Sequence, residues 1–143
     1  DAFEGYLFQA ELTKEPERQI ELLQKAVELV KGHFLEDIYG TWVLPEQERI
    51  NRIYLTTLMS LADIQKKKNM IHEALATCQR AINHEPSFEA AYLLAMKIHL
   101  QLNDRVNAIR LYEAYETIMR DELDLPPSPE MEAFYNSAIQ SAR

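Results

Sequence analysis

The chain has 143 residues and a formal net charge of −8, and 47 % of its residues are apolar. That apolar fraction excludes general disorder, and the length is enough to bury one core without disulfides or metals. The negative charge argues against a chain that grips a nucleic-acid backbone by itself, because such binding depends on Lys and Arg side chains. An acidic surface suits a protein partner instead. We therefore expect one domain spanning residues 1–143.

The number of cysteines and the hydropathy of the chain indicate the cellular compartment in which the protein works. Cys78 is the single cysteine, so no internal disulfide can form, and this fits a reducing compartment. No apolar run approaches the roughly 20 residues that a membrane helix needs, and no signal peptide is present. These features predict a cytoplasmic protein with no membrane contact. The chain lacks a starting Met, so we interpret it as a fragment of a longer polypeptide.

The first third of the chain predicts two helices. Only three glycines and six prolines occur, which favours long helices over many short strands. A first helix is indicated by apolar residues at i, i+3, i+4 and i+7, namely Phe3, Tyr6, Leu7 and Ala10. Pro16 suits the first turn of a second helix, and Gly32 is expected to end it with a positive φ.

Residues 32–45 form the irregular part of the sequence, and we expect them to fold back onto the helices as an apolar loop. Phe34, Tyr39 and Trp42 either anchor this loop or line a ligand pocket. Asp37 is expected to pair with Arg49 and so fix the loop to the next helix. Arg49 as an anion receptor is the alternative.

The remaining sequence predicts five more helices. The first two are expected from Pro45 or Glu46 to Lys68 and from Met70 to Ile82, and the third from Ser87 to Leu102. The fourth begins after Asp104 as its N-cap. The fifth begins with Ser128 as its N-cap and Pro129 as its first helical residue. Asn69 is a fair terminator of the first of them.

An internal repeat organises the second half of the chain. Small or apolar residues recur after 34 positions (108 − 74 = 34), so that Ala74, Cys78 and Ala81 correspond to Ala108, Tyr112 and Tyr115. This period is typical of tetratricopeptide (TPR) hairpins, whose small residues let paired helices pass closely. One hairpin cannot bury its own apolar face and must stack on a neighbour. We therefore predict an all-α fold of about seven helices, stacked as TPR-like antiparallel hairpins in a right-handed superhelix.

Few residues in the sequence suggest a catalytic, metal-binding or ligand-binding site. Tyr92 and His99, in the second hairpin, belong either to the core or to a concave surface that clasps a peptide. The four histidines show no metal-binding spacing, and no phosphate loop or nucleophile motif occurs. Cys78 lies among the small residues and is expected to be an inert core thiol. We expect no enzymatic activity, no cofactor and no metal.

Several motifs, in this order, resemble one family. They are Gly32-x-Phe34-Leu35-x-Asp37 followed by Trp42 and Glu48-Arg49; Cys78-Gln79-Arg80-Ala81 followed by Pro86; Ala108-x-x-x-Tyr112-Glu113; and the tail Glu122-Leu123-x-Leu125-x-Pro127-Ser128-Pro129-Glu130. Together they resemble the bacterial transcriptional activator domain of regulators of the Streptomyces antibiotic regulatory protein type. The family tail often carries glycine where Asp124 stands.

The resemblance implies a TPR-like helical bundle without enzymatic activity that follows a winged-helix DNA-binding domain. We therefore expect a non-catalytic regulatory domain of a bacterial transcription regulator. Its partners would be proteins: a second copy, RNA polymerase or another domain of the same chain. DNA would be contacted only through the upstream domain. Two alternatives stay open at this point, an effector-sensing domain that encloses a small molecule near Trp42, and a peptide-binding TPR scaffold unrelated to transcription.

Overall fold

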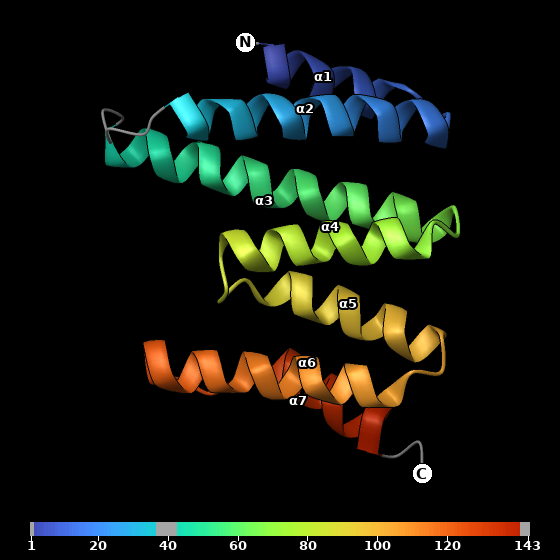
Figure 1. Cartoon of the computed structure of the whole chain (residues 1–143), viewed down its shortest axis with the longest axis vertical. Coiled ribbons are helices and arrows are strands. Elements are labelled where there is room, and N and C mark those ends of the chain that lie inside the picture. Colours follow the sequence, from blue (N-terminus) through green and yellow to red (C-terminus); the bar gives the residue numbers. More distant parts are fainter. Residues whose placement is uncertain (1, 37–42, 141–143) are drawn as a thin grey trace. The chain divides into compact units, whose positions relative to one another are not determined.

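The computed structural model describes residues 2–36 and 43–140, and their side chains for residues 2–32 and 43–138. Its elements are α1 (Ala2–Leu12), α2 (Pro16–Glu36), α3 (Leu44–Lys67), α4 (Ile71–His84), α5 (Glu89–Gln101), α6 (Arg105–Ile118), the π-helical segment η1 (Met119–Leu123), α7 (Pro129–Phe134) and the π-helical segment η2 (Tyr135–Gln140) (Figure 1). The described residues contain seven α-helices and no strand, which confirms the all-α prediction. None of the described helices is long and apolar enough to cross a bilayer.

The chain divides into two compact units, residues 1–77 and residues 78–143, and the division falls inside α4. Each unit is described by itself below. The single domain and the right-handed superhelix expected from the sequence stay predictions.

The first unit contains α1 to α3 and the start of α4. An apolar stripe on α2 is buried along its whole length. It consists of Ile20, Leu23, Ala26, Val27 and Val30. Phe3 and Ala10 of α1 and Leu58 of α3 are buried as well, so α1, α2 and α3 pack with α2 between the other two. Because an amphipathic helix is stabilised mainly by such packing, these stripes explain why the three helices form.

The prediction for Gly32 is wrong. Gly32 lies inside α2, which continues to Glu36, and its φ is not positive. Glycine permits the left-handed conformation but does not require it, and one glycine inside a helix costs only about 1 kcal/mol relative to alanine. α3 begins at Leu44, with Pro45 in its first turn, so helical structure reaches into both ends of the segment expected to be irregular.

A buried polar contact joins α3 to α4 within the first unit. Gln65 and Thr77 are 3 % and 5 % exposed, and the Thr77 hydroxyl lies 2.7 Å from Gln65 Oε1 and 2.9 Å from the Glu73 carbonyl. The Thr77 hydroxyl is the donor in both contacts, and because it carries one proton it donates either to Gln65 Oε1 or to the Glu73 carbonyl at any moment. The buried hydroxyl is thus paired in either case, as burial demands.

The same turn ends the first helix of each hairpin. Asn69 and Asn103, 34 residues apart, both have φ = 61°. The residue after each of them donates its backbone N–H, at 2.7 Å, to the carbonyl of the residue four positions before the asparagine: Met70 to Gln65, and Asp104 to His99. Asparagine is among the few residues other than glycine that adopt this conformation readily. The two turns therefore share one backbone conformation at the 34-residue spacing that the sequence shows.

Replacing either turn asparagine by alanine should destabilise the fold. Asn69→Ala and Asn103→Ala are each expected to lower the free energy of unfolding by about 1 kcal/mol, because alanine meets a steric penalty at φ = 61°. Asn103→Gly is the matched control and should be close to neutral, since glycine has no such penalty. Urea unfolding measures both. Alanine variants as stable as the parent chain would contradict the turn assignment.

The second unit closes with a short helix on a core of aromatic and methionine side chains. This core contains the buried residues Tyr92, Met96, Ala108, Tyr112, Tyr115 and Met131. Ser128 caps α7 by accepting from the Met131 N–H at 3.2 Å, and Pro129 is the first helical residue, as the sequence predicts. Asp124 has φ = 52°, the conformation that glycine favours.

Candidate functional site

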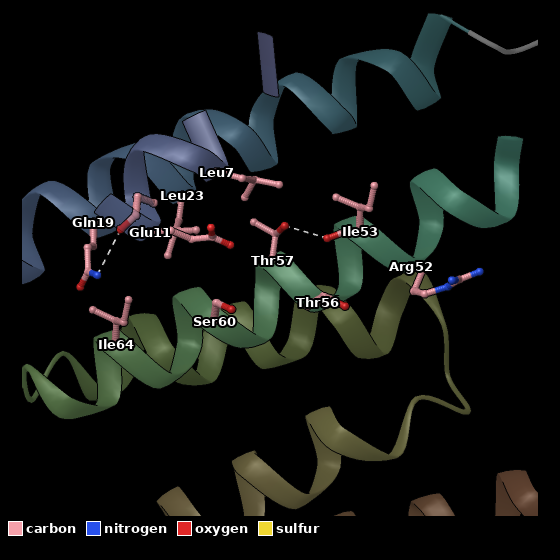
Figure 2. A pocket seen from close by; sticks show the side chains of 11 residues that line it. Leu7, Glu11, Gln19, Leu23, Arg52, Ile53, Thr56, Thr57, Ser60 and Ile64 are labelled. Atoms are coloured by element: carbon pink, nitrogen blue, oxygen red, sulfur yellow. Dashed lines mark hydrogen bonds between the residues drawn. The ribbon is translucent and has the colours of Figure 1, made fainter. Parts of the chain in front are cut away.

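An open cleft in the first unit is the candidate site. It lies between α1, the first turns of α2 and the middle of α3, and its volume is about 430 Å³ (Figure 2). That volume lies within the range of ligand clefts in proteins. Its lining residues are Leu7, Ala10 and Glu11 from α1; Gln19 and Leu23 from α2; and Arg52, Ile53, Thr56, Thr57, Ser60 and Ile64 from α3.

Hydrogen bonds to backbone carbonyls fix the walls of the cleft. Gln19 Nε2 donates to the carbonyls of Ala10 at 3.2 Å and Thr13 at 3.1 Å, which caps the end of α1 from α2. Thr57 Oγ1 donates to the Ile53 carbonyl at 2.7 Å within α3. The orphan carbonyls at the end of a helix need such partners. The end of α1 that borders the cleft is therefore held by a side chain of α2.

The polar groups that face the cleft are of two kinds. Gln19 and Thr57 are engaged in the bonds just described. Glu11, Arg52, Thr56 and Ser60 are exposed, and none of them has a hydrogen bond or ion pair with any described residue. Figure 2 shows Glu11 beside Leu23, whereas Arg52 lies beyond Ile53 at one end of the cleft, with its side chain extending away from the other lining residues. An apolar cleft thus carries one unpaired acid and one unpaired base that lie apart from each other.

Most of the predicted loop residues lie outside the part of the chain that the structure describes. Asp37, Tyr39 and Trp42 are outside the described residues, and Phe34 lies in α2 at a position where only the backbone is described. Their roles as loop anchors or pocket walls stay predictions.

Arg49 joins α1 to α3. Its Nη1 lies 3.0 Å from Glu4 Oε1, and both side chains are about half exposed. Ion pairs this exposed contribute little, roughly 0–1 kcal/mol. The predicted contact with Asp37 lies outside the described residues. Arg49 does not line the cleft, and its neighbour on the same helix, Arg52, does.

Tyr92 and His99 both lie on α5. Tyr92 is 3 % exposed, its ring packs on Tyr115 at 4.9 Å between centroids, and its hydroxyl donates to the Pro86 carbonyl at 2.6 Å. This arrangement fits the core alternative for Tyr92. His99 supports the turn, because its carbonyl accepts the Asp104 N–H at 2.7 Å.

The His99 ring is only partly satisfied. Nδ1 lies 3.3 Å from Asp104 Oδ2 but is not aligned for a hydrogen bond, and no other described residue pairs with it. The Asp104 carboxylate accepts two hydrogen bonds from Asn107, one from its backbone N–H at 3.2 Å and one from its side-chain amide at 2.6 Å. These bonds are the main cause that lowers the pKa of Asp104, and His99 contributes less. His99 thus lies at the turn that ends α5, and its role on a partner-binding surface stays a prediction.

A comparison with models of known protein families shows to which family the chain belongs. The model of the bacterial transcriptional activator domain matches residues 4–139 of the 143-residue chain. The chain belongs to this family. No curated protein matches the chain, and no solved structure does. The domain is therefore associated with transcription activation, and the family named from its sequence motifs is confirmed.

Glu89 organises the end of this activator domain, and sequence reasoning missed it. Glu89 Oε1 accepts from the Tyr115 hydroxyl at 3.0 Å and from the Ser128 N–H at 3.2 Å, and Oε2 accepts from the Ser128 hydroxyl at 2.7 Å. One carboxylate at the start of α5 thus joins α6 to the cap of α7. In the sequence, Glu89 is recognisable only as an acidic residue in the first turn of an expected helix. Such a residue usually interacts with the helix dipole.

Raising the pH above 10 should destabilise the activator domain. Burial raises the pKa of Tyr92, Tyr112 and Tyr115, and the hydrogen bond to Glu89 raises that of Tyr115 further. An unfolded tyrosine loses its proton near pH 10 while the folded one keeps it. The unfolded state then binds fewer protons, and the free energy of unfolding falls by up to about 1.4 kcal/mol per pH unit for each tyrosine. This contribution is fully present below the unfolded pKa and is lost as the pH rises toward the folded one.

Urea unfolding between pH 7 and pH 11 measures this decline. Tyr115→Phe should make the decline shallower than in the parent domain, because one of the three tyrosines with a raised pKa is then gone. A free energy of unfolding that stays constant through this range would contradict the assignment.

The described residues include one buried thiol and contain no cluster of metal-binding side chains. Cys78 is fully buried, and burial raises the pKa of its thiol to about 12, so almost no thiolate exists at neutral pH. No group of three or more His, Cys, Asp or Glu side chains that could hold a metal occurs in the described part of the activator domain. The cleft therefore stands as the candidate site, and its residues are suited to binding.

Proposed function

We propose that this chain is the non-catalytic, partner-binding domain of a bacterial transcription regulator. It acts in the cytoplasm and contacts a protein that is needed for activation: a second copy, RNA polymerase or another domain of the same polypeptide. DNA is contacted by a separate domain upstream. The observation that carries this proposal is the family match over residues 4–139.

Two features of the molecule support it. Helical hairpins with a repeated turn are typical of modules that bind other proteins, because their stacked helices leave open surfaces between them. The net charge of −8 disfavours a duplex-DNA contact by this domain alone and leaves protein partners as the better match.

The test uses the purified chain with three candidate partners. Sedimentation velocity measures self-association, and biolayer interferometry measures binding to purified bacterial RNA polymerase and to duplex DNA at physiological salt. Saturable binding to itself or to the polymerase, with no binding to DNA at micromolar concentration, is the expected result. Sub-micromolar, sequence-dependent binding of the chain to duplex DNA would contradict the proposal.

A further inference from the structure

We propose that the cleft between α1, α2 and α3 is the partner-binding site, and that it takes one extended peptide segment of a protein partner. The segment has an aliphatic centre, a basic residue near Glu11 and an acidic residue near Arg52. This inference rests on the proposed function, since it names the site and the chemical class of the partner.

The charged side chains of the cleft determine the orientation in which the peptide segment binds. Some charges in the first unit are paired, among them Glu4 with Arg49 at 3.0 Å, Asp63 with Lys67 at 2.9 Å, and Glu17 with Lys68 at 2.7 Å.

The two cleft charges belong to the unpaired set, as do other exposed charges of the first unit such as Lys14 and Glu48. Glu11 and Arg52 have no such partner among the described residues, and they lie apart from each other in the cleft (Figure 2). A ligand with a cation at one end and an anion at the other satisfies both charges in one orientation only. Such complementarity fixes the register of a partner more than it adds affinity.

The lining of the cleft matches an extended peptide. Leu7, Leu23, Ile53 and Ile64 supply apolar contacts for aliphatic side chains. Thr56 and Ser60 expose hydroxyls that have no partner among the described residues. An extended peptide carries backbone N–H and C=O groups that need partners, and a hydroxyl can both donate and accept. A helical ligand would satisfy its own backbone and would have no use for these hydroxyls.

The length of the cleft fits a short segment. Arg52 and Ile64 are 12 residues apart on α3 (64 − 52 = 12), so the wall between them is about 18 Å long at 1.5 Å per helical residue. Five or six extended residues span roughly this distance at about 3.3 Å each. Two opposite charges that lie apart in such a cleft are better matched by a peptide than by a single small metabolite.

Selection from a displayed library of random octapeptides tests the inference. The parent chain, Ser60→Trp and Gln24→Trp are each used as bait. Ser60 is exposed in the cleft, so an indole there fills it, whereas Gln24 is exposed on α2 and does not line it. Circular dichroism and urea midpoints show that each variant is folded. The parent chain and Gln24→Trp should enrich the same peptides, with aliphatic residues between a Lys or Arg and an Asp or Glu.

The enriched peptide, made synthetically with a fluorescent label, provides the quantitative test. Ser60→Trp should weaken its binding at least tenfold, and Gln24→Trp should leave binding unchanged. Glu11→Lys should weaken binding about tenfold, and a peptide with an acid in place of its basic residue should recover that loss. No enrichment by the parent chain, equal enrichment by Ser60→Trp, or indifference to Glu11→Lys would each overturn the inference.

Failure of the inference and failure of the proposed function give different results. Binding to RNA polymerase or to a second copy that persists in Ser60→Trp would remove the cleft as the site and leave the proposed function standing. Loss of that binding in Ser60→Trp but not in Gln24→Trp is the result expected if the cleft holds the partner.

Discussion

Leu58→Ala is expected to lower the free energy of unfolding by about 3–5 kcal/mol. Leu58 lies on α3 and is 0 % exposed, so the substitution removes buried methyl groups and leaves a cavity that its neighbours fill only in part. Both terms act in the same direction. Because the whole stability of a domain is typically about 5–15 kcal/mol, this change alone should shift the urea midpoint strongly.

Leu12→Ala is the matched control for this prediction. Leu12 is the same residue type in the same unit, at the end of α1, and it is 66 % exposed. The control should change the free energy of unfolding by less than about 0.5 kcal/mol, as surface substitutions usually do. Similar losses for the two variants would mean that the register of α3 is wrong.

Glu89→Ala should cost about 2–3 kcal/mol. The substitution removes an acceptor shared by the Tyr115 hydroxyl, the Ser128 N–H and the Ser128 hydroxyl. Hydrogen bonds to a charged group are stronger than neutral ones, and donors left unsatisfied in a partly buried place add a desolvation cost. Thermal and urea unfolding both measure the loss.

Two further variants separate the network from the charge alone. Glu113→Ala removes an exposed acid from α6 and should be nearly neutral. Glu89→Gln keeps one acceptor oxygen and should cost less than Glu89→Ala. A Glu89→Ala variant as stable as Glu113→Ala would show that the Glu89 bonds to α6 and α7 do not stabilise the fold.

The sequence predicted the helices well because their apolar stripes are regular. Residues at helical spacing on α2 are all buried, and small residues such as Ala74 and Ala108 are 0 % exposed. The turns at Asn69 and Asn103 were also predictable, since asparagine tolerates a positive φ and stands a few residues after each apolar stripe has ended. Gly32 misled the prediction because glycine fits both the inside and the end of a helix.

The candidate cleft could not be predicted, because it depends on contacts between distant segments. Its residues come from three helices and run from Leu7 to Ile64. Ile53 and Ile64 of α3 are half-buried because they face the cleft. The bonds of Glu89 join residues 26 and 39 positions away in the chain, and no local pattern in the sequence indicates such a pairing.

A transcription reporter tests the partner-binding role most directly. The chain is fused to an unrelated DNA-binding domain whose operator lies upstream of a weak promoter, and occupancy of the operator is measured in the same cells. We predict that the fusion activates transcription several-fold over the DNA-binding domain alone, and that Leu58→Ala abolishes the activation while Leu12→Ala retains it. A folded fusion that occupies the operator and activates no more than the DNA-binding domain alone would contradict the proposed function.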